Sequence, residues 1–250
     1  MKNNINVDII LPNYNSSKFL NETIQSIISQ DYSNWKLIII DDCSNEQTKK
    51  KLDHYKDHKK IRILYLKKNM GTGFCRNLGL RVANSQYTAF IDSDDKWRAD
   101  KISKQINYME ANNIHFSYTN YSTFKEKDIL KEIKPPKIMD FDSFTKNTSI
   151  CTSSMMISTK YAKKYKFTKT KICEDYFYKC SLLKELKKAF CLDLSLTNYR
   201  IRKGSMQSKK IKNFYWIWKI NKYYNGFNFT KNFISLILIS INSLKKYGFK

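Results

Sequence analysis

Phe90-Ile91-Asp92-Ser93-Asp94-Asp95 is the stretch around which the chain is organised, because it places three carboxylates within four residues directly after an apolar run. The run, residues 87–91, predicts a buried strand. Carboxylates this close repel one another, so folding alone gives little reason to group them. A divalent cation would remove the repulsion, since two carboxylates and phosphate oxygens form a usual Mg²⁺ shell, and Mn²⁺ accepts the same ligands. The alternative is a solvated turn that caps a helix predicted at residues 97–112.

The composition indicates one large globular domain of 250 residues with room for a full apolar core. A net charge of +24 raises the question of nucleic-acid binding. The lysines are spread along the chain, however, without a block of five or six like charges or a zinc-finger spacing. We therefore expect a general attraction to anionic surfaces and no nucleic-acid partner.

The cysteines and the apolar runs predict a cytoplasmic protein. Six cysteines include no C-x-x-C pair, so reduced thiols are expected and neither a zinc site nor a disulfide framework is indicated. We expect neither a signal peptide nor a spanning helix. The first apolar run, Ile9-Ile10-Leu11, leads straight into Pro12, and the longest, residues 233–241, contains two serines and falls short of about 20 residues.

The first hundred residues alternate predicted strands with predicted helices, a pattern typical of a parallel sheet with helices on both faces. We predict strands at residues 7–11, 37–40, 61–66 and 87–91, and helices at residues 17–30, at residues 46–55 and from the loop 69–73 through residue 83. In such sheets ligands bind outside the carboxyl ends of the strands. Pro12-Asn13-Tyr14-Asn15, Asp41-Asp42 and Asp92-Ser93-Asp94 each follow a predicted strand, so these polar clusters should converge on one edge.

The second half of the chain is less regular. We predict strands at residues 114–124, 151–157 and 194–202, helices at residues 140–147 and 176–188, a loop or hairpin at residues 125–137, and a helical pattern from residue 209 onward. Pro135-Pro136 marks the loop or hairpin as the least regular segment.

Taken in order, the polar clusters resemble the successive motifs of glycosyltransferase family 2. The matching residues are Pro12-Asn13-Tyr14-Asn15, Gln30, Ile40-Asp41-Asp42-Cys43-Ser44, Asn69-x-Gly71 with Arg76-Asn77, and Asp92-Ser93-Asp94-Asp95. The resemblance covers about residues 5–205 and is firmest in the first hundred. It implies the GT-A fold, a Rossmann-like and mostly parallel sheet flanked by helices. It also implies an inverting, metal-dependent enzyme that uses a nucleotide sugar.

The resemblance divides the chain into a GT-A domain, residues 1–205, and a basic helical tail, residues 206–250. Within the domain, residues 1–100 form the nucleotide-binding half and residues 101–205 the acceptor-binding half. The implied nucleotide-sugar site comprises Pro12, Tyr14, Asn15, Asp42, Gly71, Arg76, Asp92, Ser93 and Arg200. Asp92 and Asp94 are the implied ligands of a divalent metal, Mn²⁺ or Mg²⁺.

The residue types suit these roles. Ionised Asp42 is purely an acceptor, so it would take the N3–H of uracil. Tyr14 offers a ring for stacking on a base, with burial in the core as the alternative. Gly71 and Gly73 would let the backbone approach a ligand closely. For Arg76 two partners stay open, a protein carboxylate or the diphosphate.

The Glu174-Asp175 pair has two interpretations. Acids at the amino end of a helix complement its dipole. The resemblance implies instead that the pair supplies the catalytic base, Asp175, with Glu174 near the acceptor hydroxyls. One base suffices, because the metal neutralises the leaving diphosphate. Tyr199-Arg200 and Gly204-Ser205 resemble the segment that closes over the diphosphate, although Arg202-Lys203 stands where family members often carry His.

We therefore predict an inverting hexosyl- or N-acetylhexosaminyltransferase of the bacterial surface-polysaccharide or lipo-oligosaccharide type. The donor would be a UDP-sugar and the acceptor a glycan or a lipid-linked glycan. One alternative is a sugar-nucleotide pyrophosphorylase, although Pro12-Asn13-Tyr14-Asn15 is not the Gly-rich loop that such enzymes usually carry after the first strand. The other is a basic nucleic-acid-binding protein.

The tail is predicted to contain an amphipathic helix. Its apolar face would comprise Phe229, Phe233, Leu236, Ile237, Ile241 and Leu244, and its polar face Asn228, Asn232, Ser235, Asn242 and Lys246. The commoner fate of such an apolar stripe is to pack onto the domain. The flanking lysines and the aromatic-basic segment 214–224 favour peripheral contact with an anionic membrane, at the inner face of the plasma membrane.

Overall fold

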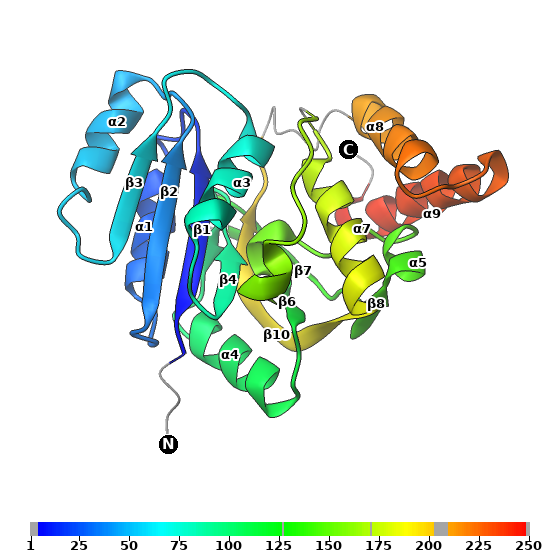
Figure 1. Ribbon diagram of the computed structural model, residues 1–250, viewed down its shortest axis with the longest axis horizontal. Helices are drawn as coiled ribbons and strands as arrows, with labels where there is room; N and C mark the ends of the chain where they lie inside the picture. The colour runs from blue at the N-terminus through cyan, green and yellow to red at the C-terminus, as the bar shows by residue number, and fades with distance from the viewer. Residues whose placement is uncertain (1–4, 127, 171, 203–209, 249–250) are drawn as a thin grey trace.

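The computed structural model describes residues 5–126, 128–170, 172–202 and 210–248. A single twisted sheet runs through the molecule with helices on both faces, and a pair of C-terminal helices lies at one end (Figure 1). The strand order is β3-β2-β1-β4-β9-β6-β10-β5, with β7 added to β6 and β8 added to β10. The α/β class predicted from the sequence is therefore confirmed.

The first half of the chain forms the parallel part of the sheet. Its elements are β1 (Val7–Asn13), α1 (Leu20–Ile28), β2 (Trp35–Asp41), α2 (Glu46–Asp53), β3 (Ile61–Tyr65), α3 (Thr72–Val82) and β4 (Tyr87–Phe90). Strand β1 pairs in parallel with both β2 and β4, and every one of its residues is buried. A strand covered on both faces and both edges is mostly apolar, as Val7, Ile9, Ile10 and Leu11 are here. The buried Asp8 is the exception, and its Oδ2 accepts from the backbone N–H groups of Asn84 and Ser85.

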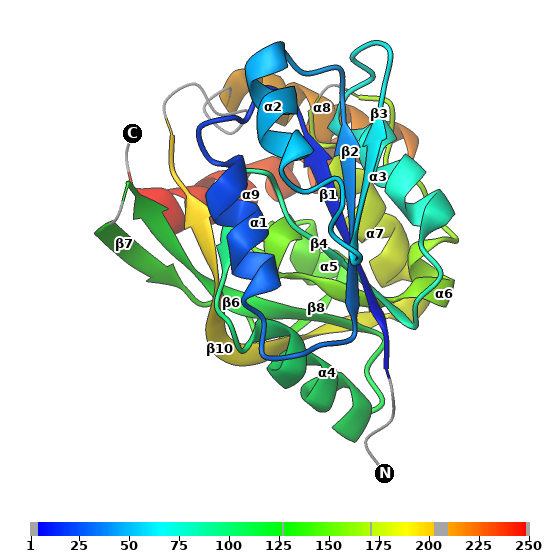
Figure 2. The ribbon, with the colours of Figure 1, turned by 90° about the vertical axis from the view of Figure 1, so that its left-hand side faces the viewer.

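The second half makes the sheet mixed. Its elements are β5 (Lys96–Trp97), α4 (Lys101–Ala111), β6 (Phe116–Lys125), β7 (Asp128–Ile133), β8 (Ile138–Asp140), α5 (Phe141–Phe144), a 3₁₀ turn (Thr152–Ser154), β9 (Met156–Ser158), α6 (Thr159–Ala162), α7 (Glu174–Leu186) and β10 (Lys188–Arg200). Strand β9 runs antiparallel to β4 and β6, whereas β10 runs parallel to β6. The expected loop or hairpin is the β6–β7 hairpin, which stands at one side of the molecule (Figure 2).

Two sequence predictions of this region are wrong. The helix expected from residue 97 begins at Lys101, after the short strand β5, so the aspartates of residues 92–95 do not cap it. Gln30 instead satisfies a backbone donor at the amino end of that helix, because its Oε1 accepts from the backbone N–H of Ile102 at 3.0 Å. The strand expected at residues 151–157 is mostly a 3₁₀ turn followed by the three-residue β9.

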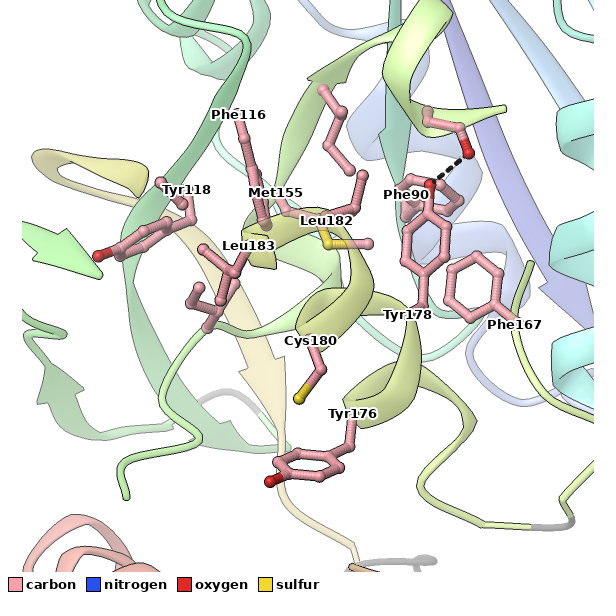
Figure 3. Close-up of a cluster of buried hydrophobic side chains, with 14 of the residues drawn as sticks. Phe90, Phe116, Tyr118, Met155, Phe167, Tyr176, Tyr178, Cys180, Leu182 and Leu183 are labelled. Carbon is pink, nitrogen blue, oxygen red and sulfur yellow. Dashed lines mark hydrogen bonds between the residues drawn. The ribbon is translucent and has the colours of Figure 1, made fainter. Parts of the chain in front are cut away.

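Buried side chains form two apolar clusters, one on each face of the sheet. Along β1, Ile9 and Leu11 belong to one cluster and Ile10 to the other, as the period of two in a strand requires. Helix α7 lies within the second cluster, where the rings of Tyr178 and Phe167 stack with centroids 3.9 Å apart (Figure 3). This packing fixes the amino end of α7, and with it the acidic pair.

The tail consists of α8 (Lys210–Tyr223) and α9 (Phe229–Tyr247), which lie beyond α7 as seen in Figure 1. Ile217, Ile220 and Ile239 are buried in the same cluster as α7. The tail therefore packs on the domain through a few aliphatic side chains, and the expected boundary between residues 205 and 206 lies outside the described residues.

Lys101 is buried at the start of α4 and gives a stability test of the fold. Its Nζ donates to Gln105 Oε1 at 2.7 Å, and burial lowers its pKa to about 7. Between this value and the ordinary pKa of about 10.4 the unfolded chain holds more protons, so stability rises with pH in that window. We expect Lys101→Met to be more stable than the wild type at pH 7, because an apolar side chain suits the site.

That advantage should shrink by about 2 kcal/mol between pH 7 and pH 9, as the wild-type lysine loses its proton in the folded state. Urea unfolding at the two pH values measures the difference. Lys104→Met, an exposed position on the same helix, is the control and should show no such pH dependence. A constant difference between the wild type and Lys101→Met would show that Lys101 stays charged in the fold.

Candidate active site

The loops that follow β1, β2 and β4 meet at one edge of the sheet, as the sequence predicts. Asn13 Nδ2 donates to Asp41 Oδ1 at 2.6 Å, which joins the end of β1 to the end of β2. Asn15 Oδ1 accepts from the backbone N–H of Asn45 at 2.8 Å, and its own N–H donates to Ser44 Oγ. These bonds give both loops a defined shape before any ligand binds.

Asp42 holds in place the loop between β3 and α3, which lies at the same edge. Its two carboxylate oxygens accept from the backbone N–H groups of Met70 and Gly71, at 2.6 and 2.8 Å. Gly71 has φ +89°, a conformation that favours glycine, and directly precedes α3. The carboxylate is buried, but two oxygens offer more lone pairs than these two bonds use. The contact of Asp42 with a base therefore stays a prediction.

Tyr14 and Pro12 differ in exposure. Pro12 is buried at the end of β1, whereas Tyr14 is 53% exposed. The alternative that Tyr14 belongs to the core is therefore wrong. Tyr14 directly follows Asn13, which donates a hydrogen bond to Asp41, and its exposed ring is free to stack on a planar base.

The three carboxylates after β4 divide into two kinds. Asp95 is fully buried and accepts from Ser153 Oγ and from the backbone N–H of Arg200. Burial raises its pKa well above the ordinary value, and Asp94 and Asp92 add to the shift. Asp95 thus ties β10 to this loop, while Asp92, Ser93 and Asp94 stay partly exposed.

Arg76 joins the two halves of the site. From within α3 it donates through Nη2 to Asp92 Oδ1 at 2.6 Å and through Nη1 to Glu174 Oε1 at 2.8 Å. The guanidinium is almost fully buried and lies 5.3 Å from the centre of the Phe167 ring. Of the two partners that the sequence left open, the structure shows the protein carboxylates. Because both Nη groups of Arg76 donate to these carboxylates, the structure does not support a contact between Arg76 and the diphosphate.

Gly73 is explained by protein packing and not by a ligand. A Cβ at this position would lie 2.6 Å from the backbone oxygen of Thr168 and 3.1 Å from Glu174 Cγ. Glycine therefore allows α3 to approach the segment that leads into α7. The close approach is what brings Arg76 within reach of Glu174.

Arg200 also has a structural role that the sequence prediction missed. Its Nε donates to the backbone oxygen of Asp94, its Nη2 donates to Glu22, and its guanidinium lies over the rings of Phe19 and Phe124. With the side chain buried in this way, the expected contact with a diphosphate is not supported. Arg202 is the exposed cation here, and its Nε lies 2.7 Å from Asp94 Oδ2. Lys203 and Gly204-Ser205 lie outside the described residues.

Glu174 and Asp175 open α7 as predicted, but their environments differ. Burial raises the pKa of Glu174 to about 6, although Arg76 opposes the shift. Burial also disfavours the charge of Asp175, yet Lys179 and Arg76 outweigh it and hold the pKa of Asp175 well below its usual range. Lys179 Nζ lies 2.7 Å from Asp175 Oδ2, and Thr152 Oγ1 donates to the same oxygen at 3.0 Å. Asp175 is the more accessible of the two, with its side chain 35% exposed against 12% for Glu174.

The chemistry of Asp92 and Asp94 fits a divalent metal bound together with a diphosphate. Burial raises the pKa of Asp94, and the nearby charge of Asp92 adds to the shift. A cation would relieve both effects, and Mg²⁺ in phosphate sites usually takes only one or two carboxylates. Among the described residues there is no group of three or more Asp, Glu, His or Cys side chains that could hold a metal alone. Phosphate oxygens would therefore have to complete the shell.

Several residues of the site have little or no signal in the sequence. Lys179 could have been found, since it follows Asp175 by one helical turn. Thr152 and Ser153 could not, because only the fold brings their turn to the two acidic clusters. The last turn of α9 also lies close to the site. Tyr247 Oη is 2.9 Å from Tyr121 Oη. Burial lowers the pKa of Lys246 to about 8, and the nearby charge of Lys179 adds to this shift.

The cluster of polar loops and acids marks the site. A hollow of about 320 Å³ that lies between α5 and α9 includes none of the carboxylates described above. The sheet edge, by contrast, joins an exposed aromatic ring, two accessible aspartates and a helix-borne acidic pair. This combination is typical of an α/β enzyme of the GT-A type.

Comparison with known proteins gives the family. The family model of Glycosyl transferase family 2 matches residues 8–170, which is more than half of the chain, so the chain belongs to this family. It is 31% identical over 243 residues to a Bacillus subtilis protein named as a teichuronic acid biosynthesis glycosyltransferase, TuaG, with 96% of each chain covered. Membership in a glycosyltransferase family sets aside the pyrophosphorylase alternative.

Two further similarities bear on the substrates and the fold. The chain is 34% identical over 208 residues to the Escherichia coli UDP-Glc:alpha-D-GlcNAc-diphosphoundecaprenol beta-1,3-glucosyltransferase WfaP. The matched region covers 82% of this chain and 81% of WfaP. The crystal structure of S. aureus TarS 1-349 in complex with UDP-GlcNAc superposes with a TM-score of 0.75 at 17% identity, over 96% of this chain and 73% of that one. The second similarity shows that the two proteins share a fold.

Removal of Arg76 should weaken the whole molecule. Arg76→Met would leave Glu174 as a nearly buried charge without its partner, which typically costs about 3 kcal/mol or more. We expect that loss in the free energy of unfolding measured with urea. Arg81→Met, an exposed position on the same helix, is the matched control and should change stability by less than about 0.5 kcal/mol. Equal losses in the two variants would contradict the central role of Arg76.

Proposed function

We propose that this enzyme transfers a hexosyl or N-acetylhexosaminyl group from a UDP-sugar to a glycan or lipid-linked acceptor, with inversion at the anomeric carbon. One observation carries the proposal: Arg76 binds Asp92 and Glu174 at once, so the donor-side carboxylates and the acidic pair of α7 face the same space. The similarity to WfaP, whose name gives UDP-Glc and a diphosphoundecaprenol acceptor, supports both substrate classes. The similarity to TuaG supports a role in bacterial surface polysaccharide synthesis.

On the donor side, Tyr14 would stack on the uracil and Asp42 would accept its N3–H. Asn15 and Gly71 belong to the loops that frame this pocket. Asp92 and Asp94 would hold Mn²⁺ or Mg²⁺, with Ser93 between them beside the ribose. When bound, the metal neutralises the charge that develops on the departing diphosphate.

On the acceptor side, Asp175 would be the base. It would take the proton of the acceptor hydroxyl while that oxygen bonds to the anomeric carbon, and the bond from this carbon to the diphosphate oxygen breaks on the opposite face. Lys179 and Thr152 keep the carboxylate ionised and oriented. Glu174, held by Arg76, would contact the acceptor hydroxyls.

A lipid-linked acceptor would place the enzyme in the cytoplasm, at the inner face of the plasma membrane. No helix among the described residues is long and apolar enough to span a bilayer.

Two variants distinguish the acidic residues. Asp175→Asn keeps the size of the side chain but cannot accept a proton, so transfer should fall by at least about 10²-fold with donor binding unchanged. Glu174→Gln is the matched control and should lose less, mainly through a higher KM for the acceptor. Single-turnover rates and donor affinity measured by calorimetry separate these effects. Near-full transfer by Asp175→Asn would exclude it as the base.

The pH profile gives an independent test of the base. With Asp175 as the base, the transfer rate should stay level from pH 7 to pH 5, because its pKa is held below the ordinary value of about 3.9. With Glu174 as the base, the rate would fall about tenfold for each pH unit below its pKa of about 6. A profile that declines below pH 6 in the wild type would therefore move the role to Glu174.

The donor and the metal are tested together. Slow hydrolysis of a panel of UDP- and GDP-sugars with Mn²⁺ or Mg²⁺ should identify a UDP-sugar as the donor. In calorimetry, Asp94→Ala should lose the metal dependence of UDP binding while keeping its melting temperature. Asp31→Ala, an exposed aspartate beyond α1, is the control. Unchanged metal-dependent UDP affinity in Asp94→Ala would remove that residue from the metal site.

A further inference from the structure

Helix α9 is oriented with its polar face toward the protein. Asn232 and Ser235 are buried: Ser235 Oγ donates to the backbone oxygen of Thr145 at 2.6 Å, and Asn232 Nδ2 donates to that of Trp218 at 3.0 Å. Asn221 of α8 donates to both side chains. A hydrogen-bonded network, together with Ile239, therefore holds the helix in place.

The apolar face of α9 points away from the protein as a result. Phe229 and Phe233 are 72% and 52% exposed, and Ile237 and Ile241 continue the exposed line at intervals of four residues. Leu236 and Leu244 are only partly buried. The alternative that this stripe packs onto the domain is therefore wrong for the four exposed side chains, because the opposite face of the helix is the buried one. Leu236, at the margin of the stripe, does pack against the core cluster.

The exposed stripe is continuous and extends onto α8. The rings of Phe229 and Phe233 lie nearly parallel with centroids 6.2 Å apart, and the ring of Trp218 lies 5.4 Å from that of Phe229. Isolated apolar side chains on a surface need no explanation, but a contiguous line of large ones marks an interaction site.

Charge decides between two occupants of this surface. Lys245 occupies the next position of the stripe, four residues after Ile241, and Lys222 follows Trp218 by one turn on α8; both are exposed. The whole chain carries a net charge of +24, so two copies would repel each other, whereas an anionic lipid surface would attract each copy. Aromatic and aliphatic side chains bordered by lysines are the composition of a helix that lies in a membrane interface.

We propose that the outward face of α9, with Trp218, docks the enzyme on an anionic lipid bilayer. Its purpose, though not its physical basis, rests on the proposed function. Asn221 Oδ1 accepts from Tyr176 Oη at 2.7 Å, one residue from Asp175, and the last turn of α9 reaches Tyr121 through Tyr247. Docking through α9 would therefore bring the acceptor side of the active site to the lipid surface, where a lipid-linked diphosphate acceptor resides.

The test is co-sedimentation of the full chain with vesicles of phosphatidylglycerol and phosphatidylcholine, without donor or acceptor. Point variants are used because removal of the tail would also remove Tyr247 from the site. We expect the wild type to bind, and Phe233→Gln/Ile237→Gln to bind at least about tenfold more weakly. Lys222→Gln/Lys245→Gln should lose about fivefold for each lysine, and the loss should disappear at high salt. Tyr65→Gln, which changes an exposed aromatic residue on β3 at the opposite end of the molecule, is the control and should bind as the wild type does (Figure 1).

Three outcomes would overturn the proposal. The first is no binding of the wild type to anionic vesicles. The second is equal binding by the wild type and Phe233→Gln/Ile237→Gln, with circular dichroism confirming that the variant is folded. If circular dichroism shows that this variant is unfolded, Phe229→Gln is tested in its place. The third is a dimer in sedimentation equilibrium that Phe233→Gln/Ile237→Gln dissociates, which would make the face an interface between copies. Since the assay requires no turnover, its result is independent of the donor and acceptor assignment.

Discussion

The double ion pair of Arg76 is the constraint on which the rest of the site depends. A nearly buried guanidinium needs carboxylate partners, and it takes one from the loop after β4 and one from the start of α7. Burial alone would lower the pKa of Arg76, but Asp92 and Glu174 raise it above the ordinary value. The loop after β4 and the start of α7 are therefore held together by electrostatics. Gly73 supports the same contact, because any larger residue would push the two segments apart.

The acids of the active site are separated by what surrounds them. Asp41, Asp42 and Asp95 are buried and accept hydrogen bonds from backbone or side-chain donors, so they shape loops. Asp42 alone of the three is also proposed to contact the base, through lone pairs that these bonds leave unused. Asp92, Asp94 and Asp175 keep some exposure, as the proposed roles in metal binding and proton transfer require. The buried carboxylates order the loops and so give the partly exposed carboxylates fixed positions. Charges held in fixed positions stabilise a transition state more strongly than charges that must first reorient.

The two helices of the tail contact elements that border the candidate active site. Helix α8 contacts α7 one residue from Asp175, while α9 ends at Tyr121 behind the same space. An asparagine and serine network is an unusual choice for the inner face of a helix, because each buried amide needs its partners to be stable. Here Asn221, Asn232 and Ser235 all have hydrogen-bond partners, and most of the large apolar side chains of α9 lie on its exposed face.

The sequence by itself determined what is local. The alternation of strands and helices, the polar clusters after β1, β2 and β4, and the Glu174-Asp175 pair at a helix start follow from periodicity and side-chain chemistry within short windows. Tertiary structure decided what joins distant residues: Arg76 meets Glu174 across 98 positions, Asp95 is buried by β10, and Arg200 is enclosed by Phe19 and Phe124. It also decided the orientation of α9, because an amphipathic pattern shows that a helix has two faces but not which of them the protein covers.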